Sequence, residues 1–278
     1  MLRPSYLCAR CLVDQATHAV ELAVEDPGER LSVMKGVVDL LHKGYPERIP
    51  AELGTMVHRY VMERSGKDPY ALLKKKSNEA ALEIIGRLRR EDLTLRKVVL
   101  AAIAGNAIDF GVDGSRDALH SLEEQLQKGL AIDQFERFEA EVDRARSILY
   151  LTDNCGEIVF DQMLVEHLVN LGKEVTVSPK QEPILNDATV QDLVSLGFGR
   201  MAAGIIPHAR NAIGLMLAEA PYEFIRVWDR TDLVIAKGMG HFETLYGTDK
   251  NIAFLLKAKC IPVAESLGVE QGDHVLTF

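Results

Sequence analysis

The first half of the chain repeats apolar residues at helical spacing. One expected helix carries its apolar face on Val33, Val37, Val38, Leu40 and Leu41. Residues three or four positions apart share one side of a helix, so this spacing predicts amphipathic helices. Further helices are expected over residues 56–61, 80–88, 98–108, 117–127 and 134–146, with Asp133 as the N-cap of the last. Prolines fall between these segments, as helix breakers should.

The pattern changes near residue 147, where short apolar runs begin to alternate with helical segments. Strands are expected at residues 148–151, 174–177, 201–206 and 233–236. Helices are expected at residues 159–171, 189–196 and 208–220, while 252–256 and 263–267 fit either a strand or a helix. Strands that alternate with helices indicate a parallel sheet with right-handed crossovers. We therefore expect a mainly helical region over residues 1–146 and a doubly wound α/β domain over residues 147–278.

Composition narrows the class of partner. The 278 residues include 32 Lys or Arg and 41 Asp or Glu, which gives a formal net charge of −9. A nucleic-acid-binding protein usually presents a basic face, so no nucleic-acid partner is expected. No apolar run reaches the roughly 20 residues that span a bilayer, and the first residues contain no apolar signal region. We expect a cytoplasmic protein without a membrane partner, whose four cysteines are reduced.

Candidate chemistry begins where the first expected strand ends. Asp153 and Asn154 follow this strand directly, ahead of Gly156 and of a helix that begins near Glu157. Ligands of open α/β sheets bind just outside the carboxyl ends of the strands. A carboxylate and an amide oxygen are hard ligands that suit Mg²⁺ or Mn²⁺. The alternative is that both residues only cap the helix, although one capping residue would be enough.

A similar pair, Asn186 and Asp187, lies between the second expected strand and the next helix. Taken alone, this pair could simply begin a helix. Neighbouring parallel strands lie about 4.8 Å apart, however, so side chains from adjacent loops can meet on one ion. The two pairs together therefore predict a metal site that includes Asp187.

Two further segments carry polar residues in apolar surroundings. Lys237 ends an apolar strand and precedes Gly238 and Gly240. A lysine there can place a positive charge on phosphate oxygens, and the glycines let backbone N–H groups face an anion; the alternative is a strand-end lysine in solvent. Asn106 and Asp109 share one face of an otherwise apolar helix, where they either line the site or close the helix.

Together these segments resemble the metal-dependent damage-control phosphatase family, formerly a domain of unknown function. The DNxGE-type, NDxT-type, KGxGNFE-type and GNxxD stretches of that family match residues 153–157, 186–189, 237–243 and 105–109. The N-terminal Cys8-Ala9-Arg10-Cys11 resembles that of its prokaryotic branch. The resemblance covers nearly the whole chain and implies a Rossmann-like α/β/α fold, with a mostly parallel sheet preceded by a helical N-terminal region.

The resemblance also implies roles for single residues. It implies metal ligands at Asp153, Asn154 and Asp187, a divalent Mn, Mg, Co or Ni ion as cofactor, and phosphate contacts near Lys237. Two departures from the family pattern stand out. His241 takes the place of an expected Asn, and residues 204–208 lack the glycine-rich stretch expected after the third strand.

The expected activity is metal-dependent hydrolysis of small phosphate esters, such as sugar phosphates or damaged phosphometabolites. A hard cation polarises phosphoryl oxygens, and the catalytic set would be Asp153, Asn154, Asp187 and Lys237. The remaining site residues are expected to bind substrate: Glu157, Asn106, Asp109, Gly238 and Gly240. The first alternative is a transferase that binds S-adenosylmethionine or a nucleotide, although the glycine-rich fingerprint of such proteins is missing. The second is a non-enzymatic metal-binding module.

The pair Cys8 and Cys11 has no assigned role. Such a pair could be half of a zinc site, a redox pair or two cysteines that face a core. Zinc normally takes four ligands, and the sequence contains no second pair with this spacing. We expect catalysis not to depend on these cysteines.

Overall fold

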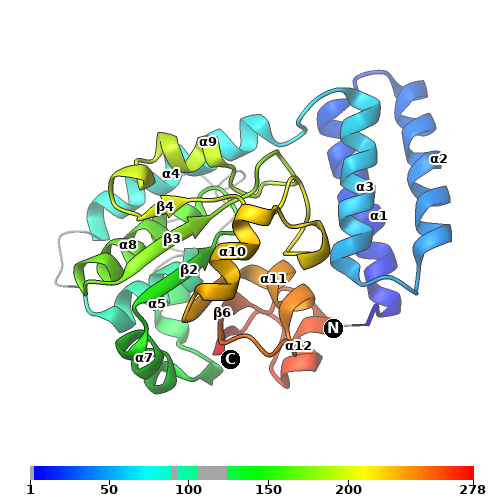
Figure 1. Cartoon of the computed structure of the whole chain (residues 1–278). Helices are drawn as coiled ribbons and strands as arrows, with labels where there is room; N and C mark the ends of the chain where they lie inside the picture. Colours follow the sequence, from blue (N-terminus) through cyan, green and yellow to red (C-terminus); the bar gives the residue numbers. More distant parts are fainter. Residues whose placement is uncertain (1–2, 89–92, 106–123) are drawn as a thin grey trace.

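The computed structural model describes residues 3–88, 93–105 and 124–278. Three N-terminal helices stand beside an α/β part in Figure 1. They are α1 (Tyr6–Ala23), α2 (Pro27–Gly44) and α3 (Pro50–Ser65). These helices enclose a small core of their own, because each turns an apolar face toward the other two; its members include Ala16, Val20, Val33, Val37, Leu53 and Val57.

Two more N-terminal helices belong in space to the α/β part. α4 (Ala71–Leu88) and α5 (Leu95–Gly105) pack against α8 (Glu157–Asn170). The apolar residues of α4, α5 and α8 share one core with the strands of the sheet. Members of this core include Ile84, Val98, Ile103, Phe160 and Ile148. In space, the helical layer that stands apart from the sheet therefore consists of α1 to α3.

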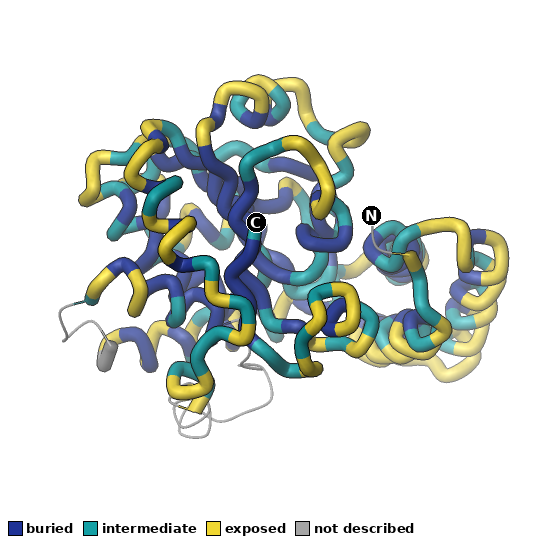
Figure 2. Tube along the Cα trace, turned by 90° about the horizontal axis from the view of Figure 1, so that it is seen from below, coloured by how far each residue is buried: buried dark blue, intermediate teal, exposed yellow. Residues whose placement is uncertain are grey.

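A seven-stranded sheet forms the centre of the α/β part. Its order is β1-β7-β6-β5-β2-β3-β4, and every neighbouring pair is parallel except β6 and β7. The strands are β1 (Ile132–Asp133), β2 (Ser147–Leu151), β3 (Glu174–Ser178), β4 (Gly204–Ile205), β5 (Leu233–Lys237), β6 (Ile252–Lys257) and β7 (His274–Thr277). The expected α/β fold with a mostly parallel sheet and a helical N-terminal region is confirmed. Figure 2 shows the buried residues concentrated along this sheet.

Helices cover both faces of the sheet. One face carries α4, α5, α8 and α7 (Phe135–Arg144) over the first core. The second core is formed with α10 (Tyr222–Arg230), α11 (Gly238–Leu245) and α12 (Ile261–Leu267). Short helical segments at the edge of the sheet are α9 (Val190–Ser195), η1 (Phe198–Arg200) and η2 (Leu217–Glu219). Within the described ranges, no helix is both long and apolar enough to cross a membrane.

The structure differs from several expected elements. Residues 208–220 do not form the expected helix; only η2 is helical there, because the segment pairs as a loop with residues 181–182 and Gly214 takes a positive φ of 67°. The two ambiguous segments become β6 and α12. The N-cap of α7 is Gln134 rather than Asp133, which ends β1 and accepts the Phe135 N–H at 3.1 Å. Part of the expected helices at 98–108 and 117–127 lies outside the described residues.

Candidate active site at the carboxyl edge of the sheet

Two loops from neighbouring strands are joined by backbone hydrogen bonds at this edge. The first follows β2 and carries Asp153 and Asn154, and the second follows β3 and carries Asp187. The Cys155 N–H donates to the carbonyl of Asn186 at 2.8 Å, and the Ala188 N–H donates to the carbonyl of Asp153 at 2.8 Å. Asn154 and Asp187 form an isolated antiparallel bridge. The three residues expected to share a site are therefore brought together by the backbone itself.

The two carboxylates carry an unfavourable concentration of negative charge. Burial and the charge of Glu157 raise the pKa of Asp153 to about 6. Burial also raises the pKa of Asp187 to about 8; Lys180 opposes this rise, and Asp153 adds to it. A bound cation stabilises the charged form of carboxylates whose pKa is raised in this way. This donor set therefore fits a hard divalent ion.

The Asn154 side chain supplies the third donor of this set. Its amide nitrogen donates to Asp153 Oδ2 at 2.9 Å and to Glu157 Oε2 at 3.2 Å. Both amide hydrogens are used in this way, so the oxygen Oδ1 is the atom of Asn154 that can bind a cation. Within the described ranges, no group of three His, Cys, Asp or Glu side chains is arranged to hold a metal ion. The candidate set here is two carboxylates and one amide.

Lys180 is a site residue that the sequence analysis missed. It is fully buried, and its ammonium lies 3.6 Å from Asp187 Oδ2. The same ammonium donates to His208 Nε2 at 2.7 Å and to the carbonyl of Gly214 at 2.6 Å. A usable signal was present, because Lys180 follows β3 closely, much as Lys237 ends β5.

Two neutral imidazoles surround this ammonium. His208 Nδ1 lies 3.0 Å from the carbonyl of Ser178, which can only accept, so Nδ1 carries the proton and Nε2 accepts from Lys180. His241 Nδ1 likewise donates to the carbonyl of Lys237 at 2.6 Å. Burial and the charge of Lys180 lower the pKa of both rings, that of His241 to about 3. His241, which stands where an Asn was expected, lies against His208, and the Nε2 atoms of the two rings are 3.2 Å apart.

Lys237 differs from its expected arrangement. Its ammonium is fully buried and donates to the carbonyl of Ala102 at 2.9 Å, to Asp161 Oδ1 at 2.7 Å and to Glu157 Oε1. A lysine ammonium has three protons, so these three acceptors use all of them. The expected ammonium directed at phosphate oxygens is therefore not present at Lys237. Glu157, the first residue of α8, is buried between Lys237 and Asn154.

The two glycines after β5 allow close approach rather than forming an open anion loop. A Cβ on Gly238 would lie 2.0 Å from Asp153 Oδ2, and the φ of Gly238 is +76°. A Cβ on Gly240 would lie 3.0 Å from the backbone nitrogen of Gly214. Gly238 thus makes room for the Asp153 carboxylate, and Gly240 makes room for the loop that contains Gly214. Asn106 and Asp109 lie outside the described residues.

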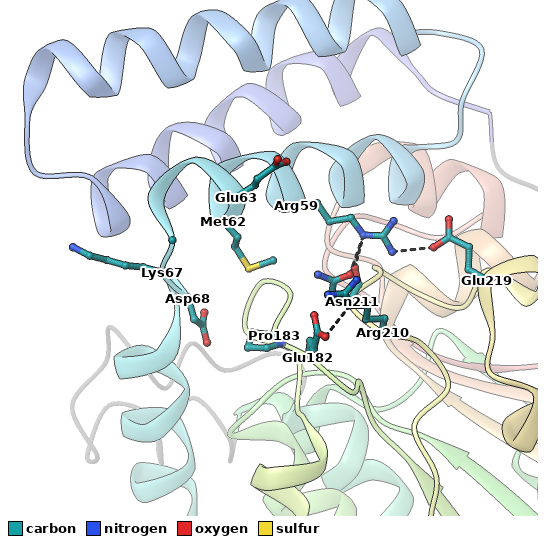
Figure 3. Close-up of a pocket in the computed structure, with 11 residues that line it drawn as sticks. Arg59, Met62, Glu63, Lys67, Asp68, Glu182, Pro183, Arg210, Asn211 and Glu219 are labelled. Carbon is teal, nitrogen blue, oxygen red and sulfur yellow. Dashed lines mark hydrogen bonds and ion pairs between the residues drawn. The ribbon is translucent and has the colours of Figure 1, made fainter.

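A cavity of about 920 Å³ opens between α3 and the loops that carry Asp187 and His208 (Figure 3). Its wall mixes both signs of charge, and none of the described residues that line it is aromatic; these are Arg59, Met62, Glu63, Gly66, Lys67, Asp68, Glu182, Pro183, Arg210, Asn211 and Glu219. Arg59 spans the cavity edge by donating to the Asn211 carbonyl at 3.0 Å and to Glu219 at 2.9 Å. The helical layer and the α/β part thus both contribute to this wall.

Cys8 and Cys11 lie on α1, apart from these loops. Cys155 lies in the first loop, directly after Asn154, but is not one of the proposed metal ligands. Cys8 Sγ accepts the Ser5 N–H at 3.4 Å, and Cys11 Sγ accepts from Gln15 at 3.1 Å, both on α1. All four cysteines are free thiols. Cys155 is buried, and this burial raises the pKa of its thiol.

Comparisons with known proteins find relatives over almost the whole chain. The model of the damage-control phosphatase ARMT1-like domain matches residues 5–275. An uncharacterized protein of Methanocaldococcus jannaschii is 38% identical, covering 97% of this chain and 93% of that protein. A damage-control phosphatase of Pyrococcus horikoshii is 37% identical, covering 99% of this chain and 97% of that protein, and one of Archaeoglobus fulgidus is 33% identical, covering 99% and 98%.

A solved structure extends the match to three dimensions. The crystal structure of a DUF89 family protein from Pyrococcus horikoshii superposes with a TM-score of 0.95 at 36% identity, over 99% of each chain. Sequence and fold therefore agree over almost the entire length. The chain belongs to the damage-control phosphatase ARMT1-like family.

Proposed function

We infer that this protein hydrolyses small phosphate esters with a divalent metal ion held by Asp153, Asn154 and Asp187. One observation carries the proposal: two hydrogen-bonded loops place a half-buried carboxylate, a buried carboxylate and an amide beside the buried ammonium of Lys180. All three proposed ligands are oxygen donors, which would suit Mg²⁺, Mn²⁺, Co²⁺ or Ni²⁺ as the bound ion. The names of the Pyrococcus and Archaeoglobus relatives support a phosphatase.

Each residue has a separate part in the reaction. When bound, the divalent ion supplies polarisation of a phosphoryl oxygen and of water. Lys180 adds a fixed positive charge on the side of Asp187, where negative charge on the phosphoryl group needs stabilising. His208 and Gly214 hold that ammonium in place by accepting its other protons. Water attacks phosphorus, the bond to the ester oxygen breaks, and inorganic phosphate and an alcohol are the products.

The substrate is proposed to be a small phosphorylated metabolite rather than a nucleic acid. The formal net charge of −9 disfavours a polyanionic partner, since binding to a phosphate backbone depends on clustered cations. The cavity beside α3 offers donors and acceptors of both signs to the organic part of the ester, as sugar hydroxyls require. Among the residues that the structure describes, its lining offers no aromatic ring on which a base could stack.

Phosphate release from a metabolite panel tests the proposal. We expect release with Mg²⁺, Mn²⁺, Co²⁺ or Ni²⁺, none after treatment with EDTA, and recovery when metal is returned. The Asp153→Ala variant serves as the inactive control. Release that survives complete chelation would remove the metal from the mechanism. Methyl transfer from S-adenosylmethionine without phosphate release would favour the transferase, and metal binding without turnover would favour the non-enzymatic module.

A further inference from the structure

A chain of buried hydrogen bonds connects the core of the α/β part to the proposed ligand Asn154. Asp161, on α8, accepts from the Lys237 ammonium at 2.7 Å. The same ammonium donates to one oxygen of Glu157, and the other oxygen of Glu157 accepts from the Asn154 amide at 3.2 Å. Lys237, Glu157 and Asp161 are each at most 1% exposed. The chain is therefore buried from Asp161 to Glu157, and only its last bond, to the half-buried Asn154, is partly exposed to water.

Lys237 carries a permanent positive charge in this place. Burial alone would favour the neutral amine, but the carboxylates of Asp161 and Glu157 outweigh burial and hold the pKa of Lys237 above its ordinary value. The carbonyl of Ala102, near the end of α5, accepts the third proton at 2.9 Å. All three protons of the ammonium are committed to protein acceptors, so none is left for a phosphate oxygen.

The orientation of the Asn154 amide follows from Glu157. With the amide nitrogen toward Asp153 Oδ2 and Glu157 Oε2, both amide hydrogens meet carboxylate oxygens. The flipped amide would direct its own oxygen at two negatively charged oxygens, which is repulsive. Glu157 thus selects the orientation in which Oδ1 is available to a cation, and Lys237 fixes Glu157.

We propose that Lys237 and Glu157 are positioning residues that act through the Asn154 amide on the metal site, rather than contacts to the substrate phosphate. The proposal rests on the proposed function, since it takes Asn154 as a metal ligand. Outer-sphere partners of metal ligands contribute about 10- to 100-fold to metal affinity in other proteins. The role predicts an effect on metal binding that is measurable without any substrate.

Glu157→Gln is the most direct variant. A glutamine has one acceptor oxygen and one donor nitrogen, so it cannot accept from both Lys237 and Asn154. Whichever way it turns, a donor meets a donor on one side. Removing Lys237 itself would leave two buried carboxylates without their cation and would endanger folding. Glu157→Gln keeps the shape of the side chain and leaves Lys237 paired with Asp161.

Isothermal titration of the metal-free full-length protein with Mn²⁺ is the measurement. We expect Glu157→Gln to weaken Mn²⁺ binding about 10- to 100-fold. Glu243→Gln is the matched control, because Glu243 is also a buried glutamate beside the sheet and takes no part in the chain of bonds; its Mn²⁺ affinity should equal that of the wild type. Far-ultraviolet circular dichroism and melting temperature confirm that each variant is folded.

Repeating the Glu157→Gln substitution in an Asn154→Asp variant tests whether the effect acts through the Asn154 amide. A carboxylate at position 154 has no orientation to lose, so in Asn154→Asp the added effect of Glu157→Gln should largely disappear. Two results together would overturn the proposal: Glu157→Gln binds Mn²⁺ as tightly as the wild type, and inorganic phosphate inhibits the variant more weakly. They would show that Lys237 and Glu157 contact the substrate phosphate instead. A wild-type protein that binds no Mn²⁺ would remove the metal site itself, and so the proposed function as well.

Discussion

Lys180 and Lys237 are both fully buried and both stand at the carboxyl ends of strands, yet their partners differ. Lys237 is enclosed by two carboxylates and a carbonyl that use all its protons. Lys180 is held by a neutral ring and a carbonyl, and its contact with Asp187 is the longer ion pair of 3.6 Å. At the scale of single residues, the partner set decides which ammonium can act on a phosphate.

Lys180→Met is expected to slow turnover while the metal stays bound. The loss in kcat should be about 100- to 1,000-fold, as for the removal of one fixed electrostatic donor. Metal affinity should be kept or should rise, because a positive charge beside Asp187 is removed. Steady-state kinetics and Mn²⁺ titration on the same preparation test both parts. An unchanged kcat would place Lys180 outside the reaction.

Asp153→Ala and Asp187→Ala are each expected to abolish metal binding and leave the fold largely intact. The charge of Asp153 raises the pKa of Asp187, so the metal-free Asp153→Ala variant should melt at or above the wild-type temperature. Asp232→Ala is a suitable control, because Asp232 lies at the opposite end of β5 and bonds to Ser147. Wild-type affinity for Mn²⁺ or Co²⁺ in both site variants would contradict the proposed ligands.

At the scale of elements, α11 begins immediately after β5 and brings its first residue against the proposed metal ligands. Gly238 takes a left-handed conformation there, and its missing side chain leaves the space that the Asp153 carboxylate fills. The junction of β5 with α11 therefore shapes the site mainly by leaving space for the Asp153 carboxylate. A larger residue there would run into the carboxylate of Asp153, a proposed metal ligand.

Gly238→Ala is expected to weaken metal binding by displacing Asp153, since its Cβ would lie 2.0 Å from Asp153 Oδ2. Gly247→Ala separates this clash from backbone strain, because Gly247 also has a positive φ, of 84°, but has no neighbour within 4 Å. Both variants should lose about 1 kcal/mol of stability from the unfavourable conformation. Equal Mn²⁺ affinity of the two variants would show that the Asp153 carboxylate tolerates the extra carbon.

At the scale of the whole molecule, a buried carboxylate makes one of the contacts between the helical layer and the α/β part. Glu243, on α11, accepts a backbone hydrogen bond from Ala51 at the start of α3, where the N-cap Ile49 makes no side-chain bond. Burial raises the pKa of Glu243 to about 7. Further contacts between the two parts run from Arg59 to Asn211 and from the Ile213 N–H to Thr55.

The Glu243 pKa predicts a pH dependence of the free energy of unfolding. The folded state keeps a proton that the unfolded state loses near pH 4.5, so stability falls as pH rises from about 4.5 to 7. Glu243→Gln should remove this part of the slope and raise the free energy of unfolding above pH 7, by up to about 3 kcal/mol. Urea unfolding of both proteins at pH 5 and pH 8 tests it. Parallel pH profiles would contradict the assignment.

Much of this architecture could be predicted from local pattern, because strands buried on both faces form continuous apolar runs, as residues 148–151 do. The pairing of Asp153 and Asn154 with Asp187 followed from the geometry of parallel strands. Packing between distant segments carried no such signal. The return of α4 and α5 to the sheet, the antiparallel β7 and the loop at 208–220 depend on contacts between residues far apart in sequence. The position of Lys180 just after β3 was a usable signal, but its partners His208 and Gly214 lie in that loop, so local pattern did not predict its contacts.

The cavity wall and the reactive groups are built on different parts of the chain. The helix α3 supplies Arg59, Met62 and Glu63 to the wall, whereas Asp153 and Asp187 lie in the loops after β2 and β3. Mutation in α3 can therefore change the cavity wall while the proposed metal ligands stay unchanged. We expect related enzymes to differ in substrate specificity through substitutions in the helical layer, while the proposed reaction stays the same.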